Sequence, residues 1–442
     1  MQLGPSPLLK TGGLHFGPRG SRALAALRGE KGRALNYLDN SYADRDMTLA
    51  LGKATDLLTF SRGYSGTYLD RSRIWRTADS NVLRLTHDPL TGEPLGALLE
   101  GARAELVRQS ANMSPSALWS SSTSFASINP RASVFAGATA WEHVADGVAS
   151  RGRFVGVGVD VAPNTNYRAS IIVEDTDNPA DKVTFGLYKK GDSSPWRGFG
   201  EYDWASNAIT QRGGSIAGAK VYDWDVGPNG GRLRKLSFSV NSMESADRYF
   251  VYPNSVGTPL PGQSTIIHHA SLSPLPYDAS PIITGDAAGF QAADNLSFAR
   301  AGTPEGTVVI RGRTAPGIGT SQYAWQWDGG SGANRMTLIR LVNRTMAFIV
   351  AVGGAQAVRL EGPIVADNTD FAAAVTFKKG QYALSLNGAP ALVNTAYTGD
   401  LPVVNTYRIG SSNVGEQWGG TVASLRLTPR ATDPADLPGM LS

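Results

Sequence analysis

Short runs in which apolar and polar residues alternate recur along most of the chain. The clearest of these runs occupy residues 167–173, 236–240, 307–311, 336–340, 346–350, 382–386 and 421–427. Because alternate residues of a strand point to opposite faces, each run predicts a half-buried antiparallel strand. Between the runs lie turn signals such as Lys379-Gly380 and Asn387-Gly388, which are typical of hairpins. The pattern therefore predicts an all-β protein built from β-sandwiches.

Composition agrees with this prediction and excludes several kinds of chemistry. The 442 residues include 51 Gly and 25 Pro, which favours many turns, and 41% are hydrophobic, which is enough for packed cores. A chain of this length predicts more than one domain, since a single core seldom grows past about 300 residues. There is no Cys. Disulfides, thiolate metal sites and thiol nucleophiles are thereby excluded.

The positive charge is concentrated at the N-terminus. Residues 1–33 carry six cationic side chains against the single acid Glu30, whereas the net charge of the whole chain is only +4. The cations are Lys10, Arg19, Arg22, Arg28, Lys31 and Arg33. The remaining residues therefore sum to −1 and present no basic stripe for nucleic acid. The arm, in which residues 21–28 are the best helical stretch, is expected to seek a negatively charged surface, which could be nucleic acid, a membrane or an acidic protein face.

Two longer stretches carry a resemblance to a known class of protein. Residues 60–70 (FSRGYSGTYLD) and 87–103 (HDPLTGEPLGALLEGAR) resemble, in order and spacing, the opening found in many bacteriophage fibre and minor structural proteins. Residues 269–294 resemble, in degenerate form, the run that ends a carbohydrate-binding-module-like sandwich in such proteins. The final segment is similar to laminin-G-like and concanavalin-like jelly rolls, through SLNG at 385–388, RIGS at 408–411 and residues 419–430.

The resemblance and the strand pattern together predict four regions. They are a basic virion-anchoring arm at 1–50, a small β-rich connecting region at 51–112, a carbohydrate-binding-module-like sandwich at 113–278 and a jelly roll at 286–442. The predicted fold is therefore a tandem of β-sandwiches after an extended or short-helical arm.

The resemblance implies a non-enzymatic structural protein of a phage or phage-like particle, in a tail or head fibre or spike. The arm would contact capsid, portal or tail proteins, and the sandwiches would adhere to host surface polysaccharide. A homo-oligomer, with a trimer favoured, is the usual form of such appendages. Localisation on the virion is expected, with no nucleic-acid partner, no membrane insertion, no cofactor and no metal.

An aromatic cluster supplies the candidate sugar-binding residues. They are Trp196, Tyr202, Trp204, Tyr222 and Trp224, with Phe199 close by. Aromatic rings on polar, Gly-rich loops can stack on sugar rings while neighbouring polar groups bond the hydroxyls. The alternative is that these rings pack in the core or between subunits.

The residues leave two functions open besides glycan adhesion, a depolymerase and a decoration protein. A glycan-cleaving depolymerase would need two carboxylates, for which Asp223 and Asp225 are the candidates. Asp175 and Asp177 could at most hold a calcium ion in a loop. The third possibility is a purely structural decoration protein without a ligand.

Overall fold

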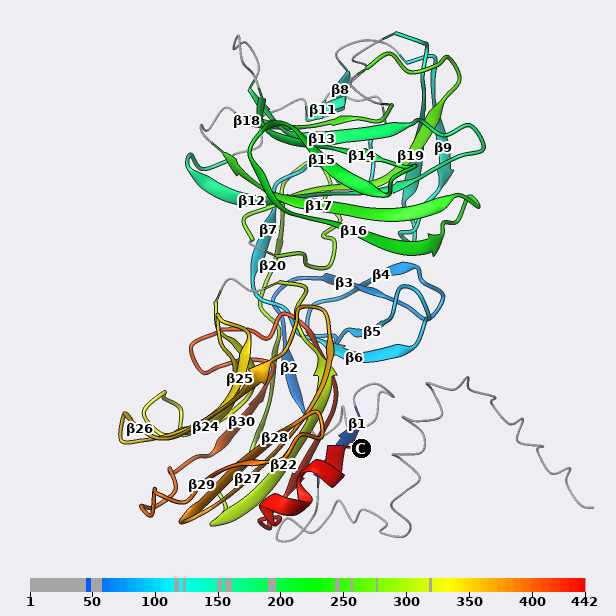
Figure 1. Ribbon diagram of the computed structural model, residues 1–442. Helices are drawn as coiled ribbons and strands as arrows, with labels where there is room; N and C mark the ends of the chain where they lie inside the picture. Colours follow the sequence, from blue (N-terminus) through cyan, green and yellow to red (C-terminus); the bar gives the residue numbers. More distant parts are fainter. Residues whose placement is uncertain are drawn as a thin grey trace, which may run out of the picture.

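The structure is a computed structural model of the chain. It describes residues 45–48 and 58–441, except 115–118, 122–124, 149–152, 156–160, 190–195, 243–246, 255–256, 276 and 318–319. Strands dominate the described part, and they form two β-sandwiches, one above the other in Figure 1. The all-β, sandwich-type fold predicted from the alternation of residues is thus confirmed. No helix in this part of the chain is long and apolar enough to cross a membrane.

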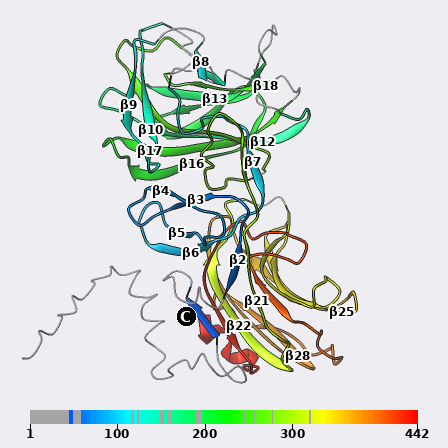
Figure 2. The same ribbon diagram turned by 180° about the vertical axis from the view of Figure 1, so that it is seen from behind.

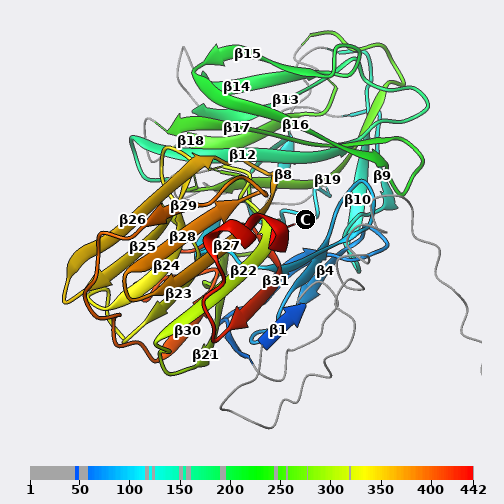
Figure 3. The same ribbon diagram turned by 60° about the horizontal axis from the view of Figure 1, so that its bottom comes forward.

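The lower sandwich, called the C-terminal sandwich here, packs an eight-stranded sheet against a seven-stranded one. Sheet I has the order β29 (Leu392–Asn394), β28 (Gln381–Leu386), β27 (Asp370–Lys378), β22 (Glu305–Arg313), β31 (Thr421–Thr428), β6 (Pro94–Leu98) and β5 (Leu85–His87), with β1 (Arg45–Thr48) also paired to β31. Sheet II has the order β2 (Thr59–Ser61), β21 (Asn295–Ala299), β30 (Thr406–Ile409), β23 (Gln322–Asp328), β24 (Arg335–Arg340), β25 (Thr345–Val352) and β26 (Ala355–Ile364). Figure 3 shows β1 lying beside β31.

The upper sandwich, called the middle sandwich, consists of two six-stranded sheets. Sheet III has the order β16 (Ile216–Val226), β17 (Arg232–Ser242), β12 (Thr165–Glu174), β19 (Ser264–Ser273), β10 (Thr139–Val144) and β9 (Ser127–Ala132). Sheet IV has the order β15 (Ala208–Gly214), β14 (Trp196–Asp203), β13 (Lys182–Lys189), β18 (Asp247–Tyr252), β11 (Arg153–Val155) and β8 (Trp119–Ser121). Its core includes Phe185, Leu236 and Phe238.

The middle sandwich is an insertion in the C-terminal sandwich. Strands β2, β5 and β6 precede it in sequence but pair with strands that follow it, so both flanks of the chain build sheets I and II. Residues 51–112, for which the sequence predicted a connecting region of its own, therefore supply strands to the C-terminal sandwich. Two short ribbons lie between the sandwiches: β7 (Arg103–Glu105) with β20 (Gly289–Gln291), and β3 (Gly66–Leu69) with β4 (Trp75–Ala78) (Figure 2).

Two local structures that the sequence predicts, a turn and a helix cap, are present. After β28, Asn387 and Gly388 have φ of 51° and 78°, the left-handed values that an Asn-Gly turn accommodates. At the C-terminus, the Asp433 carboxylate accepts the N–H of Ala435 and caps the 3₁₀ helix η3 (Pro434–Asp436), which η4 (Pro438–Leu441) follows.

A cluster of buried charges fixes the joint between the two sandwiches. The Asp294 carboxylate accepts Nη1 of Arg62 at 3.0 Å and also pairs with Nη2 of Arg84. The other terminal nitrogen of Arg84 lies 2.8 Å from Glu100, which Arg103 approaches to 3.1 Å. Burial opposes ionisation of Glu100, but Arg103 and Arg84 lower its pKa far below the usual range. Arg84 lies outside the stretches that carry the phage-type resemblance, and the other four residues lie within them. Those stretches therefore form the joint between the sandwiches.

The two crossings of the chain between the sandwiches also bond to each other. Besides the β7–β20 ladder, the Ser110 hydroxyl donates to the Ile282 carbonyl at 2.9 Å, and the Thr284 N–H donates to that hydroxyl at 3.0 Å. The hairpin β3–β4 adds an apolar contact, since Trp75 stacks on Phe135 of the middle sandwich with ring centroids 6.3 Å apart. Hydrogen bonds between the two crossings and this ring contact therefore hold the sandwiches together.

Replacing Asp294 by Ala should destabilise the C-terminal sandwich strongly. The substitution leaves the buried guanidinium groups of Arg62 and Arg84 without their shared carboxylate, and breaking a buried ion pair in this way costs about 3–5 kcal/mol. Urea unfolding measures the loss. The exposed pair Lys379–Asp400 provides the control, because solvent screens it and Asp400→Ala should leave the free energy of unfolding nearly unchanged. Similar effects of the two substitutions would show that the buried network does not stabilise the joint.

Because of Glu105, the free energy of unfolding should fall as pH rises. Burial raises its pKa from 4.5 to about 7, although Ser271, Leu272 and Val107 donate hydrogen bonds to it. The folded state therefore holds the proton more tightly than the unfolded state. This stabilisation is complete below pH 4.5 and is lost as pH rises through about 7. Relative to Glu105→Gln, the native chain should lose up to about 3 kcal/mol between pH 5 and 8 in urea unfolding. Parallel pH profiles for the two proteins would contradict this.

Candidate functional site

An open groove lies on the outer face of sheet IV, on the side away from the core of the middle sandwich. Its volume is about 530 Å³, within the 300–1,000 Å³ typical of small-molecule sites. Residues of strands β13, β14 and β15 form its floor, and Asn254, residues 257–259 and Gln263, which follow β18, form its rim. It is lined by Asp181, Lys182, Phe199, Glu201, Arg212, Asn254, Gly257, Thr258, Pro259 and Gln263.

Alternation along β14 decides which of its side chains reach the groove. Tyr202 points into the core of the sandwich, so Phe199 and Glu201 point to the opposite face. Gly200 also faces inward, where a Cβ would come within 2.9 Å of the Phe238 ring. Phe199 belongs to an apolar cluster on the outer face with Phe250 and Tyr252. The floor is therefore apolar at Phe199 and charged at Glu201.

Glu201 organises the charged part of the groove. Its carboxylate accepts the Lys182 ammonium at 3.0 Å from the neighbouring strand and the Arg212 guanidinium at 2.7 Å from the other neighbour. Glu201 is almost fully buried, whereas about half of the Arg212 side chain is exposed. The two cations and the carboxylates of Glu201 and Asp181 balance in charge, which suits a neutral, polyhydroxylated ligand.

The rim of the groove supplies amide groups. The Gln263 side-chain N–H₂ donates to Asp181 at 3.2 Å, and the Asn254 N–H₂ donates to the His143 carbonyl at 3.1 Å. The Asn254 side-chain oxygen is buried and accepts no hydrogen bond from the described residues. Because this oxygen has almost no exposed surface, a ligand in the groove does not reach it.

Tyr202 and Trp204, two of the aromatic residues predicted to bind sugar, are core residues. They are 0% and 3% exposed and contact each other edge to face. Neither ring presents a face to a ligand, which corrects the prediction for both. The prediction had placed the cluster on loops, but residues 196–203 form strand β14, in which the inward positions are covered by the opposite sheet.

The other three predicted residues lie elsewhere. Tyr222 donates its hydroxyl to Asp278 at 2.8 Å, at the joint. Trp224 packs against Trp75 with centroids 6.1 Å apart, again where the sandwiches meet. The two rings belong to sheet III, whereas the groove lies on sheet IV, so they are not part of the groove. Trp196 belongs to β14, but its side chain is outside the described part of the structure.

The remaining candidates are placed as follows. The virion-docking residues Lys10, Arg19, Arg22, Arg28, Lys31 and Arg33 lie outside the described residues. Asp175 already pairs with Arg232 at 2.6 Å, and no group of three His, Cys, Asp or Glu in the described residues could hold a metal ion. Asp223 pairs with Arg234 at 2.6 Å, and the side chain of Asp225 is outside the description.

The sequence contains one signal for the groove. It becomes visible when the segment from Phe199 to Trp204 is assigned to a strand and not to a loop. Read as a strand, the segment from Phe199 to Trp204 places Phe199 and Glu201 on one face and Tyr202 on the other. Nothing local could have indicated Lys182, Arg212 or Asn254, because they reach the groove through strand pairing and a distant loop.

Comparisons with known proteins give partial similarities only. No protein-family model matches the chain, and no curated protein sequence matches it. Similar solved structures include the CBM40 module of the Ruminococcus gnavus IT-sialidase bound to α2,6-sialyllactose, with 16% identity, a TM-score of 0.27, and coverage of 32% of this chain and 84% of that one. Another is the heptameric SAP-like pentraxin of Limulus polyphemus, with 15% identity, a TM-score of 0.26, and coverage of 33% and 72%.

A third similar structure is domain 4 of the Geobacillus stearothermophilus arabinanase AbnA in complex with arabinotriose. It has 9% identity, a TM-score of 0.29, and coverage of 34% of this chain and 73% of that domain. The three structures are thus a carbohydrate-binding module, a pentraxin and a domain of a glycan-degrading enzyme. At TM-scores below 0.3 none of them assigns a function to this chain. The resemblance to bacteriophage fibre proteins stays a prediction.

Proposed function

We propose that the protein is a non-enzymatic adhesin that binds glycans in the sheet IV groove. The observation that carries the proposal is the groove itself: an open site of about 530 Å³ that joins an apolar floor to converging charged and amide groups. Sugars present apolar CH faces and many hydroxyls, so they need both kinds of contact. Lys182 and Arg212 can donate to hydroxyl oxygens, and Glu201 can accept from hydroxyl groups.

The setting that we propose is the surface of a virus particle. The support is the resemblance of residues 60–70 and 87–103 to phage fibre proteins, together with the net charge of +5 in residues 1–33. In this arrangement the arm docks on a capsid, portal or tail protein, and the sandwiches project outward as a homo-oligomer, with a trimer favoured. Weak glycan contacts from several copies then add through effective concentration.

Replacing Arg212 by Ala should weaken glycan binding about tenfold or more. A hydrogen bond from a charged group contributes about 1.5–3 kcal/mol, and 1.4 kcal/mol corresponds to a factor of ten in affinity. Binding of the full chain to arrayed bacterial surface polysaccharides measures the effect. Arg359→Ala is the matched control, since Arg359 is an equally exposed arginine paired with a glutamate in the C-terminal sandwich. Unchanged binding by Arg212→Ala, or equal losses in both variants, would place the glycan site elsewhere.

Removing residues 1–33 should abolish incorporation into particles while leaving glycan binding intact. The reason is that the arm holds the charge excess, whereas the groove belongs to the middle sandwich. Immunoblots of purified particles give the first readout, and the polysaccharide array gives the second. If the truncated chain assembled normally, arm docking would be refuted. If it did not bind any glycan that the full chain binds, the separation of the two roles would be refuted.

A further inference from the structure

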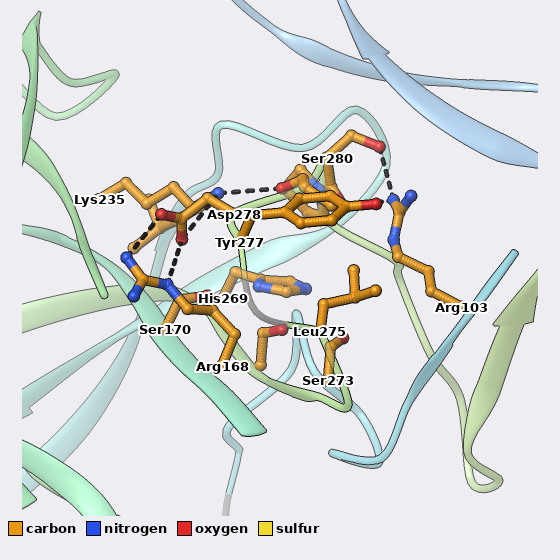
Figure 4. Close-up of a pocket in the computed structure, with 14 residues that line it drawn as sticks. Arg103, Arg168, Ser170, Lys235, His269, Ser273, Leu275, Tyr277, Asp278 and Ser280 are labelled. Atoms are coloured by element: carbon orange, nitrogen blue, oxygen red, sulfur yellow. Dashed lines mark hydrogen bonds and ion pairs between the residues drawn. The ribbon is translucent and has the colours of Figure 1, made fainter. Parts of the chain in front are cut away.

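A small cavity lies at the joint between the sandwiches (Figure 4). Its volume of about 20 Å³ leaves room for one water-sized or monatomic species. The side chains around it include Arg103, Arg168, Ser170, Lys235, His269 and Asp278. Three of them are cations and one is a carboxylate. The cavity is separate from the sheet IV groove and from its proposed ligand.

The charges around this cavity do not balance. The buried cations of the joint are Arg62, Arg84, Arg103, Arg168 and Lys235, each at most 8% exposed. Of the cations that line the cavity, Arg103 is paired with Glu100 and Arg168 with Asp278. Lys235 is the cation that shares its nearest carboxylate, Asp278, with another cation. Buried charge that lacks a counter-charge is strongly unfavourable, so something must compensate for it.

The excess charge can be traced to Lys235. The Asp278 carboxylate is already occupied, because Arg168 donates to both of its oxygens, at 3.2 and 2.7 Å, and Tyr222 donates at 2.8 Å. The Lys235 ammonium lies 4.0 Å from the nearer Asp278 oxygen and donates one hydrogen bond, to the Ala279 carbonyl at 3.0 Å. An ammonium carries three N–H donors, and the described residues accept only this one hydrogen bond from it. Its other contact is with the ring of Tyr222, whose centroid lies 5.8 Å away.

The other groups of the cavity favour a negatively charged occupant. His269 contributes no charge, since burial lowers its pKa to about 4 and its Nε2 bonds to the Ile282 carbonyl. The Ser170 hydroxyl lines the cavity and can donate. A water molecule could accept from Lys235, but it would leave the excess charge uncompensated.

We propose that this cavity binds a small monovalent anion of the halide class, held by the ammonium of Lys235 and by Nη1 of Arg103, which is buried and makes no hydrogen bond to the described residues. Arg168 contributes its charge alone, because its N–H groups already bond to Asp278, Gly218, Ser237 and Ser239. The bound anion balances the charge of Lys235. It thereby stabilises the contact between the middle sandwich and the C-terminal sandwich. The small volume favours a monatomic anion over a polyatomic one such as phosphate. The competing arrangement is an uncharged Lys235 with water in the cavity, which needs no anion.

Thermal unfolding of the full chain in different sodium salts tests the proposal. At equal ionic strength, chloride and bromide should raise Tm by about 2–4 °C relative to gluconate, which is too large to enter the cavity. Matching the ionic strength separates binding from general screening. Lys235→Met should abolish this halide response. Lys220→Met is the control and should retain it, because Lys220 lies on the adjacent strand β16 and bonds the Pro316 carbonyl without lining the cavity.

Two results would overturn the proposal: equal Tm values for the native chain in halide and gluconate, or an undiminished halide response in Lys235→Met. Crystals of the native chain in sodium bromide provide a second measurement that does not depend on the variant folding. An anomalous bromine peak beside the Lys235 ammonium supports the anion site. A cavity that holds water alone in bromide refutes it.

Discussion

The buried carboxylate of Asp294 between the guanidinium groups of Arg62 and Arg84 is the contact on which the architecture depends. It joins residues more than two hundred positions apart and closes the C-terminal sandwich around an inserted domain. Because every partner is desolvated, the charges must stay paired, and this requirement fixes the positions of the chain segments that carry them. Glu100 and Arg103 extend the same network to the strand that enters the middle sandwich.

This joint also determines which way the groove faces. Sheet III lies toward the joint, where Arg168 and Lys235 contact Asp278, and sheet IV forms the opposite layer of the middle sandwich. The outer face of sheet IV is thus turned away from the C-terminal sandwich (Figure 1). Trp75 and the β7–β20 ladder hold the middle sandwich at further points. A groove mounted in this way fits the proposed role in adhesion, because a bonded joint restricts the orientations that a flexible linker would allow.

Local sequence patterns are sufficient to predict structure where the role of a side chain depends on its immediate neighbours. Alternation located strands such as β22 and β31, Asn387-Gly388 marked a turn, and Asp433 marked a helix cap. The same reasoning fails at Tyr202 and Trp204, because a cluster rich in Gly and aromatic residues is typical of a loop, whereas here it belongs to strand β14 and the turn after it. Glycine there reflects crowding instead, since at Gly200 the opposite sheet leaves no room for a side chain. That crowding comes from Ile209 on the neighbouring strand β15 and from Phe238, which is remote in sequence.

The sequence by itself determined the all-β class, the strand periodicity, the concentration of positive charge in the first 33 residues and the absence of cysteine chemistry. Each of these follows from the order or type of residues in one local window. The tertiary structure decided that the middle sandwich is an insertion, that the phage-type motifs form a buried charged joint, and that Lys182, Glu201, Arg212 and Asn254 share one groove. These outcomes depend on strand pairing and ion pairing between segments far apart in the chain, where the free energy of burial, and not local propensity, selects the partners.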